Sequence, residues 1–244
     1  MQVLRGFDNT PHFRHAVATI GSYDGLHCGH RQLIDKVISR AKAIGGESLV
    51  LTFEPHPRIT LRQDEGLRLL TTLEEKTAIL EGLGIDYLLV IPFDIPFSRL
   101  SHEVFISDYI VGRLGIEELV IGYNHHFGHN KSGDYAYLLA NGGTLRVTEV
   151  EQQLVDTHKV SSTIIRQTIE RGDMALAAQL TGRPYIIIGI ANEDGFIATD
   201  RYKLLPPPGN YNVTINGSPN RVQITNYGID AGKAFASSHL TIAL

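Results

Sequence analysis

Two histidines stand close to the N-terminus in a glycine-rich segment, which reads Asp-Gly-Leu-His-Cys-Gly-His over residues 24–30. An apolar run precedes the segment and apolar residues at helical spacing follow it, which predicts a buried strand, a turn and a helix. The start of a helix attracts phosphate, because free N–H groups and the positive end of the helix dipole point at it. His27 and His30 can donate hydrogen bonds there to a triphosphate and stabilise the charge that develops when its α-phosphorus is attacked. The segment is therefore a candidate catalytic site.

The surroundings of these histidines favour a functional interpretation over an incidental one. Two histidines three residues apart on a surface helix mean little alone, but the strand before, the helix after and the glycines Gly25 and Gly29 give them a context. Cys28 raises a metal site as an alternative, yet no second cysteine or suitably spaced acid completes a zinc ligand set. We interpret Cys28 as a packing residue.

A second candidate is the run Val-Ser-Ser-Thr-Ile-Ile-Arg over residues 160–166. Ser162 is expected to be the N-cap of a helix, and Arg166 lies about one turn further along the same face. Hydroxyl groups, free N–H groups and a guanidinium that converge on one point suit a polyphosphate. The alternative is an ordinary capped helix with a solvated arginine, which would be preferred if the histidine segment were absent.

Two loops are further candidates. Residues 122–134 hold three histidines within five residues; a zinc or nickel site is one interpretation, and a polar wall around a nucleotide is the favoured one. Phe127 can offer a flat face to an aromatic ligand, although core packing is the commoner use of phenylalanine. In the loop at residues 53–58, two prolines stop strand pairing. A stiff turn and a wall that places His56 and Arg58 over the strand ends are equally supported there.

Composition limits the class of protein. The 244 residues carry 22 Lys and Arg against 26 Asp and Glu, a net charge of −4, with no basic stripe of the kind that binds nucleic acid. One cysteine excludes an internal disulfide framework and fits a reducing compartment. The N-terminus lacks the apolar core of a signal peptide, and no stretch reaches the length of a membrane span. A cytoplasmic protein that acts on small molecules, with neither a nucleic-acid nor a membrane partner, is expected.

Strand and helix patterns alternate along the first three quarters of the chain. Strands are expected at 16–21, 48–53, 87–91, 119–121 and 145–150, and helices at 72–83, at 104–114 and in a stretch that ends near Ile44. Thr72 and Glu75 form a capping box at the start of the helix over 72–83. The alternation predicts an α/β fold with a Rossmann-like, doubly wound parallel sheet that binds its ligand at the carboxyl ends of the strands.

The pattern changes after Pro184. Short strand candidates separated by turns come next, at 185–191, 196–199, 211–215, 222–225 and 240–243. The expected domains are therefore an α/β domain over residues 1–184 and a small, barrel-like all-β module over residues 185–244. Few polar groups in the module are suited to catalysis, so we expect a structural role. An uncovered strand edge could also pair with a second copy of the chain, which makes a homo-oligomer a candidate partner.

Taken together, the motifs resemble the bacterial FAD synthetases, the bifunctional riboflavin kinase/FMN adenylyltransferases. The resemblance covers residues 15–185 in order and at the family's spacing. The matching segments are Gly21–His30, Phe53–Pro57, Leu70–Leu73 with Glu75 and Lys76, Gly122–Asn124 with Phe127 and Gly128, Gly133 and Asp134, Ser161–Arg166, Gly172 and Asp173, and Gly182–Tyr185. The histidine segment and the Ser-Ser-Thr run alone would indicate only the wider nucleotidyltransferase superfamily, whereas Phe-Glu-Pro-His-Pro and the Phe-Gly loop are typical of the flavin branch.

The resemblance implies an enzyme that makes FAD and pyrophosphate from FMN and ATP, with Mg²⁺ bound through the ATP phosphates. The FMN phosphate is already an anion, so the protein must align it with the α-phosphorus and neutralise charge, without a nucleophile of its own. The implied catalytic residues are His27, His30, Ser161, Ser162, Thr163 and Arg166. The implied ATP-binding residues are Gly21, Ser22, Tyr23, Gly25, Gly29 and Asn124. The implied FMN-binding residues are Asp24, Pro55, His56, Pro57, Arg58, His126 and Phe127.

The sequence departs from the family in two places. His126 stands where a full cation is usual, which bears on phosphate binding. The family's kinase barrel is longer than the segment after Tyr185 and contains Gly-Phe-Pro-Thr-x-Asn; here residues 196–200 read Phe-Ile-Ala-Thr-Asp, so riboflavin kinase activity is expected to be lost. Two alternatives remain open: a flavin-nucleotide-binding sensor without catalysis, and a nucleotidyltransferase with a different acceptor.

Overall fold

A computed structural model of the chain describes residues 1–8, 10–123, 125–151, 154–155 and 158–244. The chain forms two compact units, each of which is described by itself. Unit 1 comprises Met1–Tyr23, Gly29–Glu65 and Thr77–Gln153, and unit 2 comprises Asp24–Cys28, Gly66–Lys76 and Leu154–Leu244. The domain boundary that the sequence places after residue 184 stays a prediction.

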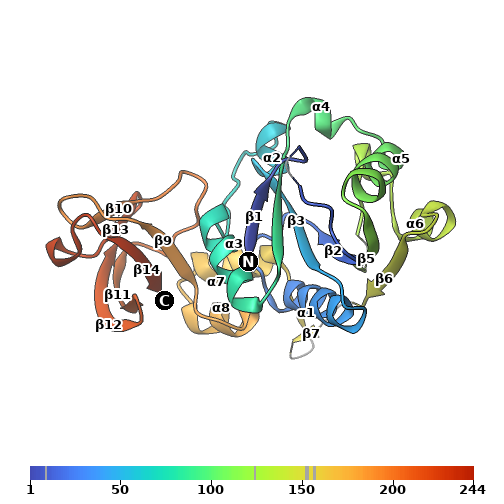
Figure 1. Cartoon of the computed structure of the whole chain (residues 1–244). Helices are drawn as coiled ribbons and strands as arrows, with labels where there is room; N and C mark the ends of the chain where they lie inside the picture. The colour runs from blue at the N-terminus through green and yellow to red at the C-terminus, as the bar shows by residue number, and fades with distance from the viewer. Residues whose placement is uncertain (9, 124, 152–153, 156–157) are drawn as a thin grey trace. The chain divides into compact units, whose positions relative to one another are not determined.

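Unit 1 contains a parallel six-stranded sheet (Figure 1). Its strands are β1 (Gln2–Arg5), β2 (Ala16–Ile20), β3 (Ser48–Glu54), β4 (Tyr87–Pro92), β5 (Ile116–Gly122) and β6 (Arg146–Val150). The order is β1-β4-β3-β2-β5-β6, so the chain runs outward from β2 and then crosses back to β5. This reversal makes a switch point between β2 and β5, where α/β sheets bind ligands. The Rossmann-like sheet expected from the sequence is confirmed; β1, which is short and mostly exposed, was not foreseen.

The helical segments of the chain from its start to β6 include the long ones that the sequence predicts, together with shorter ones that it does not. They are α1 (Cys28–Ala43), α2 (Pro57–Thr60), α3 (Leu73–Leu83), α4 (Ile95–Ser98), α5 (His102–Val104), the π-helix η1 (Phe105–Arg113), the 3₁₀ turn η2 (His129–Lys131) and α6 (Tyr135–Asn141). The capping box is confirmed, because the Thr72 amide donates to Glu75 Oε2 (2.8 Å) and the Glu75 amide donates to Thr72 Oγ1 (3.2 Å). The helix expected at 104–114 exists, but most of it has π-helical hydrogen bonding.

Unit 2 contains an antiparallel six-stranded sheet, drawn in orange to red in Figure 1. Its strands are β9 (Ile186–Ile190), β10 (Phe196–Ala198), β11 (Gly209–Ile215), β12 (Ser218–Ile224), β13 (Gly228–Asp230) and β14 (His239–Ala243). The order β10-β13-β12-β11-β14-β9 puts the consecutive strands β9 and β10 at opposite edges, so the sheet curls into a nearly closed barrel. A Cβ on Gly189 would lie 2.6 Å from Ile197 Cγ2, which explains the glycine where the two edges approach. The barrel-like module is confirmed, and β13 is a strand that the sequence did not indicate.

The rest of unit 2 precedes the barrel in the chain. It includes the two short strands β7 (Leu154–Val155) and β8 (His158–Lys159) and the helices α7 (Ser162–Glu170) and α8 (Met174–Thr181); the 3₁₀ turn η3 (Lys233–Phe235) lies within the barrel segment. Ile165 and Ile169 of α7 belong to the same buried apolar cluster as Ile187, Ile215 and Ile242 of the barrel. Helix α7 and the barrel therefore share one hydrophobic core.

In unit 1, α1 is fixed to the sheet by an ion pair with a buried glutamate. Arg40 Nη2 lies 2.8 Å from Glu118 Oε2, and Thr148 Oγ1 donates to Glu118 Oε1 at 2.9 Å. The Glu118 side chain is 1% exposed. Burial alone would raise the pKa of Glu118, but the hydrogen bonds from Arg40 and Thr148 outweigh burial and hold the pKa below 4.5. The pair therefore holds α1, which carries His30 in its first turn, against the sheet.

Replacing Glu118 with Gln should lower the free energy of unfolding at pH 7 by about 1.5–3 kcal/mol, the range for hydrogen bonds to charged groups. A carboxyl whose pKa is lower in the folded state stabilises the fold above its unfolded pKa, and this contribution is lost as the pH falls through the folded pKa. The difference between wild type and variant should therefore shrink below about pH 4.5 in denaturant titrations. Glu117→Gln, next in sequence and half-exposed, is the control. A difference that stays constant down to pH 3 would contradict the assignment.

Candidate functional site

In unit 2, the start of α7 gathers the serine and arginine residues expected to bind phosphate. Ser161 is the N-cap: its backbone is extended, and its Oγ accepts from the Ile164 amide at 3.4 Å. The prediction that Ser162 caps the helix is wrong, because Ser162 is the first helical residue and its Oγ donates to the Asp24 carbonyl at 2.9 Å. Two adjacent serines carry the same capping preference, so the sequence could not separate them. Thr163 is exposed.

Arg166 lies at the same end of α7. Its Nη2 forms an ion pair with Asp24 Oδ2, and its Nε donates to the Arg68 carbonyl at 2.6 Å. The Arg166 side chain is 23% exposed, so the guanidinium is fixed at two points while part of it faces solvent. A planar guanidinium fixed in this way is suited to bind a phosphate group.

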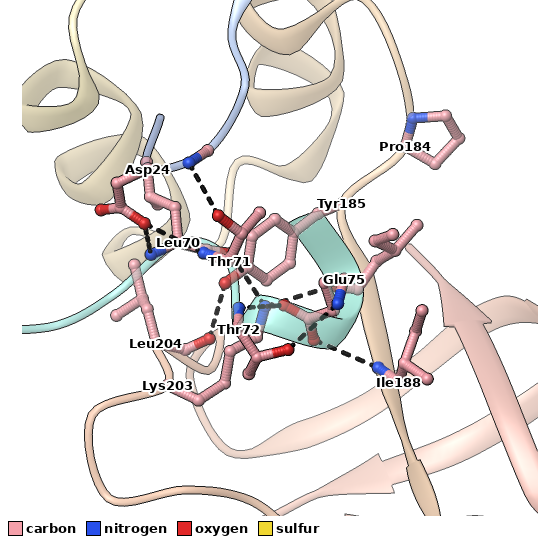
Figure 2. A network of polar contacts seen from close by, with 12 residues as sticks. Asp24, Leu70, Thr71, Thr72, Glu75, Pro184, Tyr185, Ile188, Lys203 and Leu204 are labelled. Carbon is pink, nitrogen blue, oxygen red and sulfur yellow. Dashed lines mark hydrogen bonds and ion pairs between the residues drawn. The ribbon is translucent and has the colours of Figure 1, made fainter. Parts of the chain in front are cut away.

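Asp24 is the centre of this arrangement. Its Oδ1 accepts from the amides of Leu70 (2.8 Å) and Thr71 (3.1 Å), as Figure 2 shows. Its Oδ2 pairs with Arg166. The carboxylate is 6% exposed. The resemblance implies an FMN contact for Asp24. In the structure both carboxylate oxygens bind groups within unit 2. The FMN contact stays a prediction.

The turn that leads to His27 is held by Thr71, the neighbour of Leu70, and by Arg183. The Gly25 amide donates to Thr71 Oγ1 (3.1 Å), and Arg183 Nη2 donates to the Gly25 carbonyl (2.9 Å). Gly25 has φ +86°, and a Cβ there would lie 2.6 Å from Leu70 Cδ1, so any other residue would strain the turn. His27 is buried, and burial lowers its pKa to about 4, although Asp24 opposes the shift. At neutral pH His27 is therefore an uncharged imidazole that donates one N–H.

In unit 1, the segment after β2 holds a second group of predicted residues. Tyr23 is buried, its hydroxyl lies 2.6 Å from Thr19 Oγ1, and burial raises its pKa. The Tyr23 ring meets the His30 ring edge to face, with centroids 5.2 Å apart. A Cβ on Gly21 would lie 3.2 Å from this tyrosine ring. The segment of Gly21, Ser22 and Tyr23 thus positions His30, which follows Gly29 in the first turn of α1.

The loop after β3, also in unit 1, is more ordered than a simple turn. His56 Nδ1 caps the short helix α2 by accepting from the Arg58 amide at 3.3 Å, and Pro57 is the first helical residue. Arg58 turns back on its own loop, where its Nε donates to the Gln63 carbonyl at 2.8 Å. Pro55 is exposed. The loop is a compact, self-supported feature, and its contact with FMN stays a prediction.

The loop after β5 lies on the other side of the switch point in unit 1. Phe127 is buried among His102, Phe105 and Tyr137, and it pairs with Gly133 through two backbone hydrogen bonds. In this structure it serves as a core residue. His126 is exposed and Asn124 lies outside the described residues, so the ligand contacts expected of both stay predictions.

The sequence did not predict the buried ion pair inside unit 2. Lys203 and Glu75 form a buried ion pair, with Nζ 2.6 Å from Oε2 and side-chain exposures of 1% and 0% (Figure 2). Burial lowers the pKa of Lys203, and Glu75 opposes this effect. The capping box drew attention to Glu75 only as the start of a helix. No sequence signal connected it with a lysine 128 residues away.

The described residues contain neither a candidate metal-ligand cluster nor a candidate membrane-spanning helix. No three His, Cys, Asp or Glu side chains in this part of the chain gather in a way that could hold a metal ion. None of the helices found in the described ranges has the length and apolar character needed to cross a lipid bilayer.

The parallel sheet with its switch point and the polar start of α7 are typical of Rossmann-like nucleotidyltransferases. The FAD synthetase family model matches residues 9–164, and the chain belongs to this family. It is 35% identical to a bifunctional riboflavin kinase/FMN adenylyltransferase of Listeria monocytogenes over 71% of this chain and 55% of that protein. The protein of the same name from Pseudomonas fluorescens is 35% identical over 78% of this chain and 61% of that protein.

The Bacillus subtilis protein of the same name is 33% identical over 83% of this chain and 68% of that protein. The chain thus matches between about half and two thirds of the length of these relatives. A crystal structure described as a macrolide-efflux protein from Streptococcus pneumoniae has the same fold, with a TM-score of 0.80 over 99% of this chain and 96% of that one. At 23% identity, that likeness concerns the fold alone.

The low pKa of His27 gives a test of the site's electrostatics. A histidine whose pKa falls from 6.5 to about 4 on folding lowers the free energy of unfolding as the pH drops from about 6.5 to about 4, because the unfolded state binds the proton more strongly. We expect the His27 ring to titrate near pH 4 in NMR spectra, assigned with a His27→Asn variant. A His27 pKa above 6 would contradict the buried, neutral imidazole.

Proposed function

We propose that this protein is an FMN adenylyltransferase, which makes FAD and pyrophosphate from FMN and ATP. The observation that carries the proposal is the start of α7, where Ser162 and Arg166 are both tied to Asp24 in a chain that belongs to the FAD synthetase family. Hydroxyls, helix N–H groups and a fixed guanidinium at one end of a helix suit the phosphates of a nucleotide.

The reaction is a direct displacement at phosphorus. An oxygen of the FMN phosphate attacks the α-phosphorus of ATP, a new P–O bond forms, and the bond from that phosphorus to the β-bridging oxygen breaks. Pyrophosphate leaves with the electron pair of that bond. Since the attacking phosphate oxygen is already anionic, the protein needs no general base and acts by alignment and by neutralising charge.

The residues of unit 2 are assigned to the triphosphate. Arg166 and the start of α7, with Ser161, Ser162 and Thr163, would neutralise the charge that builds up on the departing pyrophosphate. His27, neutral at physiological pH, would donate a hydrogen bond without drawing a proton from the reaction. Gly25 lets the backbone approach the nucleotide closely.

The residues of unit 1 are assigned by their place around the switch point. His30, braced by Tyr23, would donate to the ATP phosphates, and the Gly21–Ser22 segment and Asn124 would border the nucleotide. Pro55–Arg58, His126 and Phe127 are assigned to the flavin side. Mg²⁺ would enter on the phosphates of ATP and would be part of the substrate, as is common for nucleotide-dependent transferases.

Riboflavin kinase activity is proposed to be absent from this polypeptide. Where the family's Gly-Phe-Pro-Thr-x-Asn segment is expected, residues 196–198 form strand β10, and Ile197 is 1% exposed in the barrel core. An apolar core residue at this point supplies no group that could hold a nucleotide or a metal ion.

The proposal is tested by incubating the full chain with FMN, ATP and Mg²⁺, and separately with riboflavin, ATP and Mg²⁺. We expect FAD and pyrophosphate in the first reaction and no FMN in the second, measured by chromatography. FMN from the second reaction would overturn the loss of kinase activity. Binding of FMN or FAD with no product and no response to ATP would support a sensor, and transfer to another phosphate acceptor would support a different nucleotidyltransferase.

Replacing His30 with Ala should lower the rate of FAD formation by two to three orders of magnitude, about 3–4 kcal/mol, as for the loss of one preorganised transition-state donor. The melting temperature should change little, because His30 is only half-buried. His239→Ala, a change at an exposed histidine of the barrel, is the matched control and should keep full activity. A His30→Ala variant with near wild-type turnover would remove this histidine from the mechanism.

A further inference from the structure

We propose that Lys203, from the barrel segment of the chain, is a positioning residue for the phosphate-binding end of α7 and acts through residues 68–75 on Asp24 and Arg166. The proposal rests on the proposed function and adds to it, because it makes the barrel part of the adenylyl-transfer machinery. The contrary expectation from the sequence is that the module is only structural.

Lys203 fills a site in which every ammonium proton has an acceptor. Its Nζ donates to Glu75 Oε2 at 2.6 Å, to the Leu70 carbonyl at 2.8 Å and to the Ile186 carbonyl at 3.1 Å. The ammonium also lies 4.3 Å from the centroid of the Tyr185 ring, a favourable cation–π contact. A charge buried this completely is costly unless it is fully paired, so its geometry is strictly defined.

Glu75 links Lys203 to the start of α3. Its Oε2 accepts from the Thr72 amide as well as from Lys203, and its Oε1 accepts from the Ile188 amide of β9 at 3.1 Å. Beside it, the segment pairs directly with the barrel chain: the Leu69 amide donates to the Tyr202 carbonyl at 2.6 Å, and the Leu204 amide donates to the Leu69 carbonyl at 2.9 Å. The strip of residues 68–75 is thereby held by the barrel.

Leu70 connects Lys203 with Asp24, as Figure 2 shows. Its carbonyl accepts from Lys203, and its amide donates to Asp24, the residue that pairs with Arg166. The neighbouring Arg68 carbonyl holds Arg166 directly, and Thr71 holds Gly25. Displacing this strip by a fraction of an ångström therefore moves the guanidinium and the glycine turn together.

A purely structural role is the competing explanation, since any buried ion pair lost from one side destabilises a fold. The two explanations differ in what they predict for ligand binding by protein that remains folded. A structural residue changes the melting temperature and leaves the affinity for ATP unchanged. A positioning residue lowers the affinity, and it does so only while Arg166 is present to be positioned.

The test uses the full chain and four variants: Lys203→Met, Glu75→Gln with Lys203→Met, Arg166→Ala, and Arg166→Ala with Lys203→Met. The paired change at Glu75 and Lys203 leaves no unpaired buried charge, so it keeps the test valid if Lys203→Met alone does not fold. Lys233→Met, at a lysine that is 82% exposed on the barrel, is the matched control. Binding of Mg²⁺–ATP and of inorganic pyrophosphate is measured by calorimetry, at a temperature at which circular dichroism shows each variant folded.

We expect the Kd for Mg²⁺–ATP to rise about tenfold in both Lys203 variants that retain Arg166, and by less than about twofold when Lys203→Met is added to Arg166→Ala, as for residues coupled in one network. Unchanged Kd values in the folded Lys203 variants, or an equal further loss without Arg166, would overturn the proposal. If the wild type binds ATP but makes no FAD, the proposed function fails while this coupling stands; a wild type that binds neither ligand contradicts both.

Discussion

The carboxylate of Asp24 is the interaction on which the candidate site depends. It is almost completely buried, and it accepts two backbone N–H groups from Leu70 and Thr71 while it pairs with Arg166. A buried carboxylate that accepts from this many donors fixes the orientation of all its partners. Because the Asp24 carbonyl also accepts from Ser162, one residue connects the turn before His27 with the first turn of α7.

The same carboxylate explains why unit 2 is built from three separate stretches of the chain. The short segments 24–28 and 66–76 belong to the same unit as the C-terminal part, because their polar groups hydrogen-bond to residues of that part. Helix α7 and the barrel also share one apolar cluster, so burial of Ile165 and Ile169 stabilises both at once. The helix that is proposed to bind phosphate thus takes its support from the barrel.

The sequence predicted the elements whose signals are local. Apolar runs indicated β2 to β5, and the capping box marked the start of α3. Strands β1 and β13 were missed because they have three or four residues and no long apolar run. The choice of Ser162 as the N-cap failed because its neighbour Ser161 has the same side chain, and only the backbone conformation distinguishes them.

The candidate site was predicted in its residue types and less well in their roles. His27, Ser162 and Arg166 were identified from spacing and from the family resemblance, whereas the burial of Asp24 and the part played by Lys203 depend on contacts between residues more than a hundred positions apart. Such contacts follow from the packing of the whole unit, which no local pattern records. The Phe127 ring, which the resemblance assigns to the flavin, packs in the core of unit 1, and its contact with FMN stays a prediction.

The most direct test is a kinetic comparison of Asp24→Asn with wild type. Asparagine keeps an oxygen for the Leu70 and Thr71 amides and removes the charge that holds Arg166, so the change isolates the ion pair. We expect the KM for ATP to rise about tenfold with the KM for FMN within about twofold of wild type, as for the loss of a group that positions one substrate. A rise in the KM for FMN with an unchanged KM for ATP would contradict this account and would place Asp24 on the flavin side instead.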